Sequence, residues 1–245
     1  SYRGPGLGGG GVYLRDWLTC VLYLGQHDPR FVLRPPLARW RRLCGEPRPA
    51  LPNAMPRLPP TGCLGRGREL LILERLLTQQ ASVFIKGVGG SGKTTLAVEL
   101  ASWFLRINRY RQIAYVHADD AINPHALLEV LGQQLLPASE PWAVDQYPSL
   151  WQALDALRQA LWPRPILIVL DQTERWSVEH DNDFQRFWRA LADHWPALHL
   201  VALGRLGPPP FAQPWAEMKL AALDEIEAIS LIAQALIAAG EGPPP

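Results

Sequence analysis

The chain has 245 residues, 48% of them hydrophobic, which is enough apolar material for one folded domain with a proper core and an appendage. Its formal net charge of +1 provides no overall field that would attract nucleic acid or an acidic membrane surface, so neither is an expected partner. Three cysteines lie far apart without a Cys-x-x-Cys pair, which argues against a disulfide framework or a zinc site and favours a reducing, cytoplasmic location. No apolar stretch approaches the roughly 18 residues that a membrane span needs.

Residues 1–60 form a separate block of composition. Glycines dominate residues 4–11 and prolines residues 47–60, so most of the block is predicted to be a linker. Residues 20–24 (Cys-Val-Leu-Tyr-Leu) are strand-like, and a single strand is not stable alone. This run either joins the main sheet or closes an upstream domain, and we favour the second interpretation. The absence of a first Met and the Gly-Pro-Pro-Pro end favour a piece of a longer protein.

The remainder of the chain alternates between helical and strand-like segments. Apolar residues recur with helical spacing in residues 68–80, 93–107, 124–136, 149–162, 183–195 and 224–239, and short apolar runs predict strands at 82–85, 113–116, 165–170, 198–203 and 217–220. These strands are too apolar for a half-exposed sheet, so we expect an α/β fold with three layers, α/β/α, and a mainly parallel sheet. Five tryptophans in or beside the helices are predicted to pack in the core: Trp103, Trp151, Trp162, Trp188 and Trp195.

A glycine-rich loop follows the first of these strands. Residues 87–94, Gly-Val-Gly-Gly-Ser-Gly-Lys-Thr, fit the pattern GxxxxGK[ST] and stand between a strand and a helix. Backbone N–H groups can surround a phosphate only where side chains do not block them, and the helix that follows directs its positive end to the same place. Lys93 would contact the β- and γ-phosphates, and Thr94 would offer a hydroxyl to Mg²⁺. The predicted ligand is a purine nucleoside triphosphate, ATP with Mg²⁺, held by Gly87, Val88, Gly89, Gly90, Ser91, Gly92, Lys93, Thr94 and Thr95.

The second expected element is a carboxylate at the end of a neighbouring strand. Asp171 follows the apolar run Leu-Ile-Val-Leu, and with Thr94 it is the predicted metal site, acting through the water shell of Mg²⁺. Many ATPases of this class place an acidic residue directly after that Asp, where this chain has Gln172. Glu174 is the nearest replacement: it either orients the attacking water or is an exposed carboxylate at a helix start. Fast turnover is therefore not expected.

Further segments resemble the STAND class of signal-transducing NTPases, in particular its NB-ARC-like bacterial members. Residues 64–70, Leu-Gly-Arg-Gly-Arg-Glu-Leu, are similar to the segment that precedes the phosphate loop and flanks the adenine, although Gly67 stands where the family has Glu, so Gly65 and Arg66 are the residues that carry over. Residues 170–174 are similar to the Leu-Asp-Asn-x-Glu form of the acidic motif, which supports Glu174. Arg205 follows an apolar strand, and it is similar in this position to the family's arginine that senses the γ-phosphate. The alternative is that Arg205 is an ordinary surface arginine in a loop.

The flanks of the chain resemble other parts of such proteins. Residues 223–231 are similar to the start of the family's next helical subdomain, and residues 15–24 look like the closing strand of a caspase-like CHAT effector domain. The implied organisation is a linker with a remnant of an upstream domain at 1–60, a P-loop nucleotide-binding domain at 61–222 and the start of a helical subdomain at 223–245.

The resemblance implies an ATP/ADP-binding regulatory switch with slow Mg²⁺-dependent hydrolysis by Lys93, Asp171, Glu174 and Arg205. Its partners would be other domains of the same longer protein, with homo-oligomers forming on activation. Two alternatives stay open. One is an AAA-type ATPase that acts on DNA or protein, and the other is a non-hydrolysing scaffold for which nucleotide is a structural ligand, as Gln172 would favour.

Overall fold

The computed structural model describes residues 50–137, 141–176, 182–193, 195, 197–209 and 214–239. The chain divides into two units, Ser1–Pro47 and Arg48–Pro245, and every described element belongs to the second. The strand expected at residues 20–24 and the CHAT-like segment therefore lie outside the described residues.

The centre of the second unit is a five-stranded parallel sheet. Its order is β2-β3-β4-β1-β5, with β1 at Ser82–Lys86, β2 at Gln112–His117, β3 at Ile166–Asp171, β4 at Leu198–Gly204 and β5 at Ala216–Lys219. Lys86 pairs with Gly204, and His117 pairs with Asp171, so the carboxyl ends of these strands lie along one edge. In an open parallel sheet this edge is where ligands bind.

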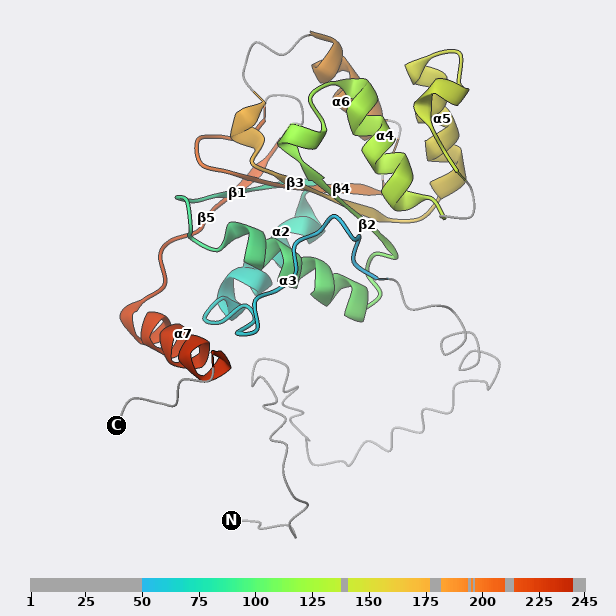
Figure 1. The fold of residues 1–245 in the computed structure, drawn as a ribbon. Coiled ribbons are helices and arrows are strands. Elements are labelled where there is room, and N and C mark those ends of the chain that lie inside the picture. Colours follow the sequence, from blue (N-terminus) through green and yellow to red (C-terminus); the bar gives the residue numbers. More distant parts are fainter. Residues whose placement is uncertain are drawn as a thin grey trace, which may run out of the picture. The chain divides into compact units, whose positions relative to one another are not determined.

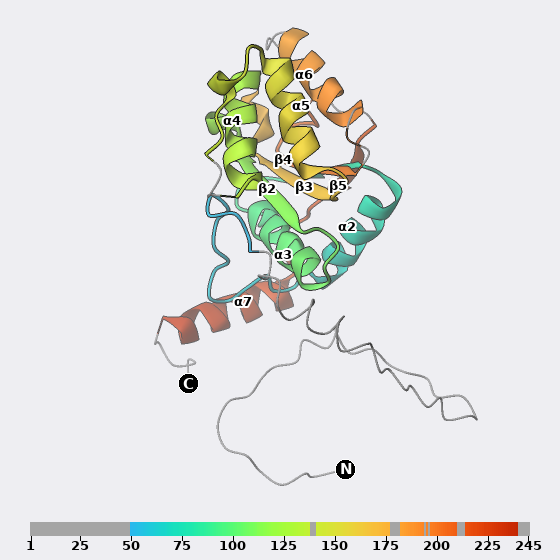
Figure 2. The same ribbon diagram turned by 90° about the vertical axis from the view of Figure 1, so that its right-hand side faces the viewer.

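Helices cover both faces of the sheet, as Figures 1 and 2 show: α4, α5 and α6 lie on one face, and α2 and α3 lie on the other. Asn123 accepts a hydrogen bond from the Ala126 N–H and caps α4, and Ser149 caps α5 in the same way through Gln152. The predicted three-layer α/β/α architecture is confirmed. The helices are α2 at Gly67–Gln79, α3 at Lys93–Arg106, α4 at Pro124–Leu135, α5 at Leu150–Leu161, α6 at Asn182–Asp193 and α7 at Glu225–Ala238, with 3₁₀ turns η2 at Ala118–Asp120, η3 at Val144–Gln146 and η4 at Thr173–Arg175.

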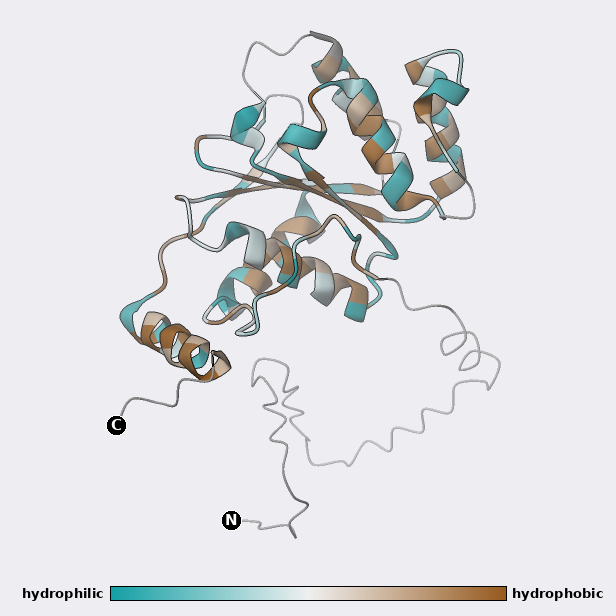
Figure 3. Ribbon diagram, viewed as in Figure 1, coloured by the Kyte–Doolittle hydropathy of each residue, from teal (hydrophilic) through white to brown (hydrophobic). Residues whose placement is uncertain are grey.

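The central strands are buried on both faces, which is why their sequences are apolar without alternation. Figure 3 shows the same apolar residues enclosed between the two helical layers. The prediction that five tryptophans pack in the core holds for Trp188 and Trp195 but is wrong for Trp151 and Trp162, which are 40% and 50% exposed. These two side chains lie at the first turn and just past the last turn of α5, so they project beyond the packed middle of the helix.

Helix α7 differs from the other helices in how little of it is buried. It begins with a capping box in which the side chains of Asp224 and Glu227 each accept a hydrogen bond from the other residue's N–H. It is the most apolar of the described helices (Figure 3) but buries none of its residues. Ile226, Ile229 and Ile232 are each at least 59% exposed. Over the described residues, no helix is both long and apolar enough to cross a membrane.

Candidate functional site

The glycine-rich loop connects β1 to α3 at the carboxyl edge of the sheet. Gly90 and Gly92 have φ of 76° and 89°, the left-handed region that glycine adopts at little cost. A Cβ atom on either residue would meet nothing within 4 Å, so backbone conformation explains these two glycines and crowding does not. Because Gly92 is the residue that precedes α3, the free N–H groups of the first helical turn adjoin the loop. The local sequence thus builds an anion-binding turn.

A cavity of about 490 Å³ opens beside this loop, within the usual size range of small-molecule sites. Its lining combines glycines of the loop and Thr95 with apolar residues such as Leu64, Leu223 and Leu231. A polar region beside an apolar one suits a ligand with a phosphate chain and a flat base. The lining residues are Pro59, Thr61, Gly62, Cys63, Leu64, Arg66, Val88, Gly89, Gly90, Ser91, Gly92, Thr95, Ala222, Leu223, Ala228 and Leu231.

Lys93 folds back onto the loop. Its Nζ donates hydrogen bonds to the carbonyl oxygens of Gly87 at 3.0 Å and Val88 at 2.9 Å. Burial lowers the pKa of the Lys93 ammonium; nearby, Glu174 raises it and Arg205 lowers it by smaller amounts. The ammonium is held by weak neutral acceptors at the position where a phosphate would be a stronger partner.

Asp171 ends β3 and is 4% exposed. Its Oδ2 accepts a hydrogen bond from Thr94 Oγ1 at 2.8 Å, and its Oδ1 accepts one from the backbone N–H of Gln172 at 2.8 Å. The prediction that Asp171 stands on the strand next to β1 is wrong, because β4 lies between β1 and β3. Helix α3 spans this gap and brings Thr94 to the carboxylate. Since the Thr94 hydroxyl donates its hydrogen, its oxygen lone pairs are free for a cation, so the pair fits Mg²⁺.

The sequence did not reveal the third donor to Asp171. Tyr115 Oη, from β2, donates to the same Oδ2 at 2.8 Å. Burial raises the pKa of the Tyr115 phenol, and the neighbouring Asp171 raises it further, so the phenol keeps its proton and remains a donor. The available signal was a tyrosine near the end of an otherwise aliphatic predicted strand.

Glu174 and Arg205 are brought together beside the loop. Gln172 has φ of 56°, an uncommon value for a residue with a side chain, and the turn η4 that follows carries Glu174. Glu174 Oε1 pairs with Arg205 Nε at 3.3 Å. Arg205 Nη2 lies 3.4 Å from the position that a Cβ atom would occupy on Gly89, so the guanidinium of Arg205 lies beside the loop. The structure thus brings Glu174 and Arg205 together beside the loop, and their roles as water-orienting carboxylate and phosphate-sensing arginine stay predictions.

Gly65 and Arg66 have structural partners of their own. The Arg66 guanidinium donates to the carbonyl oxygens of Ser91 at 3.2 Å and Ala221 at 2.8 Å, and it pairs with Glu69 at 2.9 Å. It lines the cavity but is 6% exposed, and its hydrogen bonds tie the loop to the segment before α7. Gly65 is not among the lining residues. It has φ of 69°, and a Cβ there would lie 2.7 Å from the side chain of Glu227.

The unsatisfied polar atoms near the loop also fit a ligand. Ser91 Oγ and Glu174 Oε2 are buried and have no hydrogen-bond partner among the described residues. A buried polar atom without a partner is costly, and a phosphate chain with its water and cation would supply partners. The donors, the hydroxyl and the carboxylates therefore fit a magnesium nucleotide.

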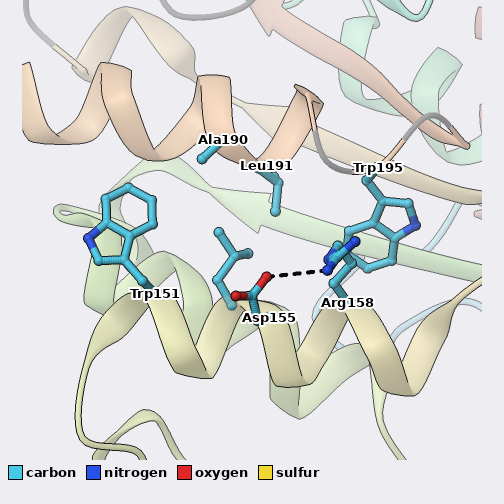
Figure 4. A pocket seen from close by; sticks show the side chains of 7 residues that line it. Trp151, Asp155, Arg158, Ala190, Leu191 and Trp195 are labelled. Atoms are coloured by element: carbon cyan, nitrogen blue, oxygen red, sulfur yellow. Dashed lines mark ion pairs between the residues drawn. The ribbon is translucent and has the colours of Figure 1, made fainter.

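A smaller cavity of about 90 Å³ lies between α5 and α6 and shares no residue with the first. Figure 4 shows Trp151 and Trp195 at its two ends and an ion pair between Arg158 Nη2 and Asp155 Oδ1, which are 3.5 Å apart. Its lining is mostly apolar, and nothing in it resembles a phosphate site.

Three comparisons relate the chain to known proteins. Residues 70–185 match the NB-ARC domain family. A search of curated proteins gives no match. Solved structures with the same fold include the ORC2 protein of Aeropyrum pernix in ADPNP–ADP complexes, with 20% identity and a TM-score of 0.57; the match covers 74% of this chain and 54% of that one. Drosophila ORC bound to DNA has 18% identity and a TM-score of 0.56, and the match covers 71% of this chain and 47% of that one. A Walker-type ATPase of Pyrococcus abyssi is similar too, with 12% identity and a TM-score of 0.55, and the match covers 78% of this chain and 63% of that one.

These likenesses to solved structures are at low identity and concern the fold, and the chain spans only about half the length of the ORC proteins. The family match covers the segment that runs from α2 through the phosphate loop to Asp171 and into α6. The chain therefore carries an NB-ARC-like P-loop NTPase domain, a nucleotide-binding module.

Proposed function

We propose that this module is a regulatory switch that binds ADP and ATP with Mg²⁺ and hydrolyses ATP slowly. The observation that carries the proposal is the meeting of Lys93, Asp171, Glu174 and Arg205 at the loop. They come from α3, β3, η4 and the residue directly after β4. A phosphate chain in the loop would draw Lys93 away from two carbonyl oxygens. Mg²⁺, held by Thr94 and through water by Asp171, would neutralise charge on the β- and γ-phosphates.

The arrangement supports slow turnover. Gln172 has no basic group with which to activate water, and Glu174 is engaged by Arg205. For Glu174 to accept a proton from water, that ion pair must loosen, and a γ-phosphate near Gly89 would compete for the same arginine. Arg205 would thus distinguish the triphosphate from the diphosphate, and its movement would release the carboxylate only in the triphosphate state.

The contacts of α7 support a regulatory role. Ala228 and Leu231 of this helix line the cavity, and Glu227 lies against Gly65. A nucleotide would therefore touch the core domain and α7 together and favour one arrangement of the two. The exposed isoleucines of α7 support contacts with other domains of a longer protein. Assembly into homo-oligomers on activation and a cytoplasmic location belong to the same proposal through the family resemblance and the cysteine usage.

Two alternatives have specific support. Gln172 favours a scaffold that binds nucleotide without hydrolysing it. The fold shared with ORC proteins, one of them solved on DNA, favours an AAA-type ATPase that acts on DNA, although the net charge of +1 gives no general attraction to it.

Nucleotide binding and phosphate release by the wild type, Lys93→Ala and Glu174→Gln would test the proposal. We expect the wild type to bind ADP and ATP in a Mg²⁺-dependent way. Lys93→Ala should lose about 10- to 100-fold in nucleotide affinity, because it lacks the charge-assisted contacts to phosphate. Glu174→Gln should bind nucleotide with near-normal affinity but release no phosphate. Lys219→Ala, which alters an exposed lysine on the edge strand β5, is the control. Binding without release above the Lys93→Ala background would leave the scaffold alternative, and an absence of nucleotide binding would reject both.

A further inference from the structure

Two hydroxyl groups converge on one oxygen of Asp171. Thr94 Oγ1 and Tyr115 Oη each donate to Oδ2 at 2.8 Å, while Oδ1 is taken by the N–H of Gln172. Thr94 belongs to the predicted phosphate loop. Tyr115 belongs to neither predicted motif, and it comes from β2, at the far edge of the sheet from β5.

Tyr115 is held from both sides. Within the sheet it lies opposite Val169 of β3, two residues before the pair His117 and Asp171, so its phenol extends along the sheet toward the strand end. On the other side of β2, Gln134 of α4 accepts from the Tyr115 N–H and donates to its carbonyl oxygen, each at 2.8 Å. Tyr115 as a whole is 6% exposed. A residue fixed in this way can hold the atom that its hydroxyl touches.

We propose that Tyr115 is a positioning residue for the cation site: its hydroxyl fixes the Asp171 carboxylate so that Oδ2 stays directed at Thr94. The inference rests on the proposed function, because it concerns the cation that accompanies the nucleotide. With Oδ2 fixed, the Thr94 hydroxyl keeps donating to Asp171 and keeps its lone pairs available for the cation. Without the phenol oxygen, the carboxylate can rotate and the Thr94 hydroxyl loses a constant orientation.

A purely structural role for the phenol makes a different prediction. If Tyr115 only filled space, its ring would be sufficient, and removal of the oxygen would alter stability alone. If it acts through Asp171, removal of the oxygen weakens cation binding. Nucleotide binding without the cation is preserved, because the phenol donates to Asp171 whereas Lys93 donates to Gly87 and Val88 of the loop.

The test is a pair of titrations on the full 245-residue chain with Tyr115→Phe, which removes one atom and keeps the ring. Binding of Mn²⁺ in the presence of saturating ADP is followed by electron paramagnetic resonance, and binding of ADP is measured separately in EDTA. We expect Tyr115→Phe to weaken Mn²⁺ by about 10-fold, at the low end of the effect of residues that orient a metal ligand. ADP affinity in EDTA should change by less than about two-fold, because the phenol acts through Asp171 and the cation.

Tyr110→Phe is the matched control, since Tyr110 is 1% exposed and precedes β2 at the opposite end of that strand. It should alter neither titration. Adding Tyr115→Phe to Asp171→Asn should produce no further loss of Mn²⁺ affinity, because the two changes would remove the same arrangement.

An unchanged Mn²⁺ affinity in Tyr115→Phe, an equal loss of ADP affinity in EDTA, or additive losses in the double variant would each overturn the inference while leaving nucleotide binding in place. A wild-type chain that binds no ADP would instead reject the proposed function, and this inference with it.

Discussion

Arg205 offers the sharpest test of how the site would distinguish ATP from ADP. The perturbation is Arg205→Met, which removes the charge and keeps much of the side-chain length. In the structure the Arg205 side chain is 65% exposed, pairs with Glu174 at 3.3 Å and lies beside Gly89. A γ-phosphate would replace the Glu174 partner, whereas ADP presents no group at that position.

The size of the effect is the difference between two interactions of Arg205: the ion pair with Glu174 that it loses and the contact with the γ-phosphate that it makes. An exposed ion pair contributes about 0–1 kcal/mol, and a charge-assisted hydrogen bond to phosphate contributes about 1.5–3 kcal/mol. The difference leaves about 1–2 kcal/mol for the triphosphate, which corresponds to about 5- to 30-fold in affinity. Arg205→Met should therefore lower the preference for a non-hydrolysable ATP analogue over ADP by about that factor and leave ADP affinity within about two-fold.

The assay is competition of each nucleotide against a fluorescent ADP analogue at saturating Mg²⁺. Arg175→Met is the control: Arg175 is also a largely exposed arginine, on η4, but it pairs with Asp119 at 3.0 Å and donates to Gln172. It should leave the ATP-to-ADP preference unchanged. An equal loss of both nucleotides in Arg205→Met, or an unaltered preference, would refute the role of Arg205 as the group that senses the third phosphate.

Three further predictions concern the cavity and the core. Ala228→Trp should fill the part of the cavity beside α7 and lower nucleotide affinity at least about 10-fold by calorimetry, as expected where a large side chain occupies a binding site; unchanged affinity would place the ligand elsewhere. Gly132→Ala should lower the free energy of unfolding, measured in urea, by about 1–2 kcal/mol, because the new methyl group would overlap the indole of Trp142. The cost of this overlap should exceed the gain of about 1 kcal/mol in helix propensity. A variant more stable than the wild type would contradict this packing. Burial lowers the pKa of the His199 imidazole, so as the pH falls the unfolded chain binds the proton before the folded chain does. The free energy of unfolding should therefore fall as the pH drops below 6.5, the ordinary pKa of histidine. If the melting temperature of a His199→Asn variant falls as steeply with pH, other groups are responsible.

Much of this fold can be predicted from the sequence because its segments are unambiguous locally. The apolar run at residues 165–170 and the pattern at residues 87–94 specify a buried strand and a strand–loop–helix unit almost without reference to the rest of the chain. Apolar spacing predicts α7 to within one residue at each end, and the capping box of Asp224 and Glu227 marks its start in the structure. The order of the strands is not encoded in this local way, and so the position of β4 between β1 and β3 was missed.

The parts of the site that escaped prediction depend on contacts between distant segments. Tyr115 and Asp171 are 56 residues apart, and their hydrogen bond exists only because β2 and β3 pair in one register. Arg66 is predicted from its motif as a nucleotide ligand and lines the cavity, but its hydrogen bond to the carbonyl oxygen of Ala221, 155 residues away, could not be predicted. Propensity and spacing describe neighbours along the chain, whereas the partner of a long polar side chain is decided by tertiary packing.

The same distinction shows how the cavity would act as a switch under the proposed function. One end of it is lined by the glycine-rich loop, which connects β1 and α3, two elements packed in the core. Its other end uses Ala228 and Leu231 of α7, a helix with no fully buried residue. A single helix of this length has marginal stability in water, so its position depends on the contacts available to it. A ligand that touches both ends stabilises the arrangement in which they meet, by about 2.7 kcal/mol when it is present at 100 times its Kd. Under the proposed function, occupancy of the loop would thereby change the position or stability of α7, and a neighbouring domain would detect that change.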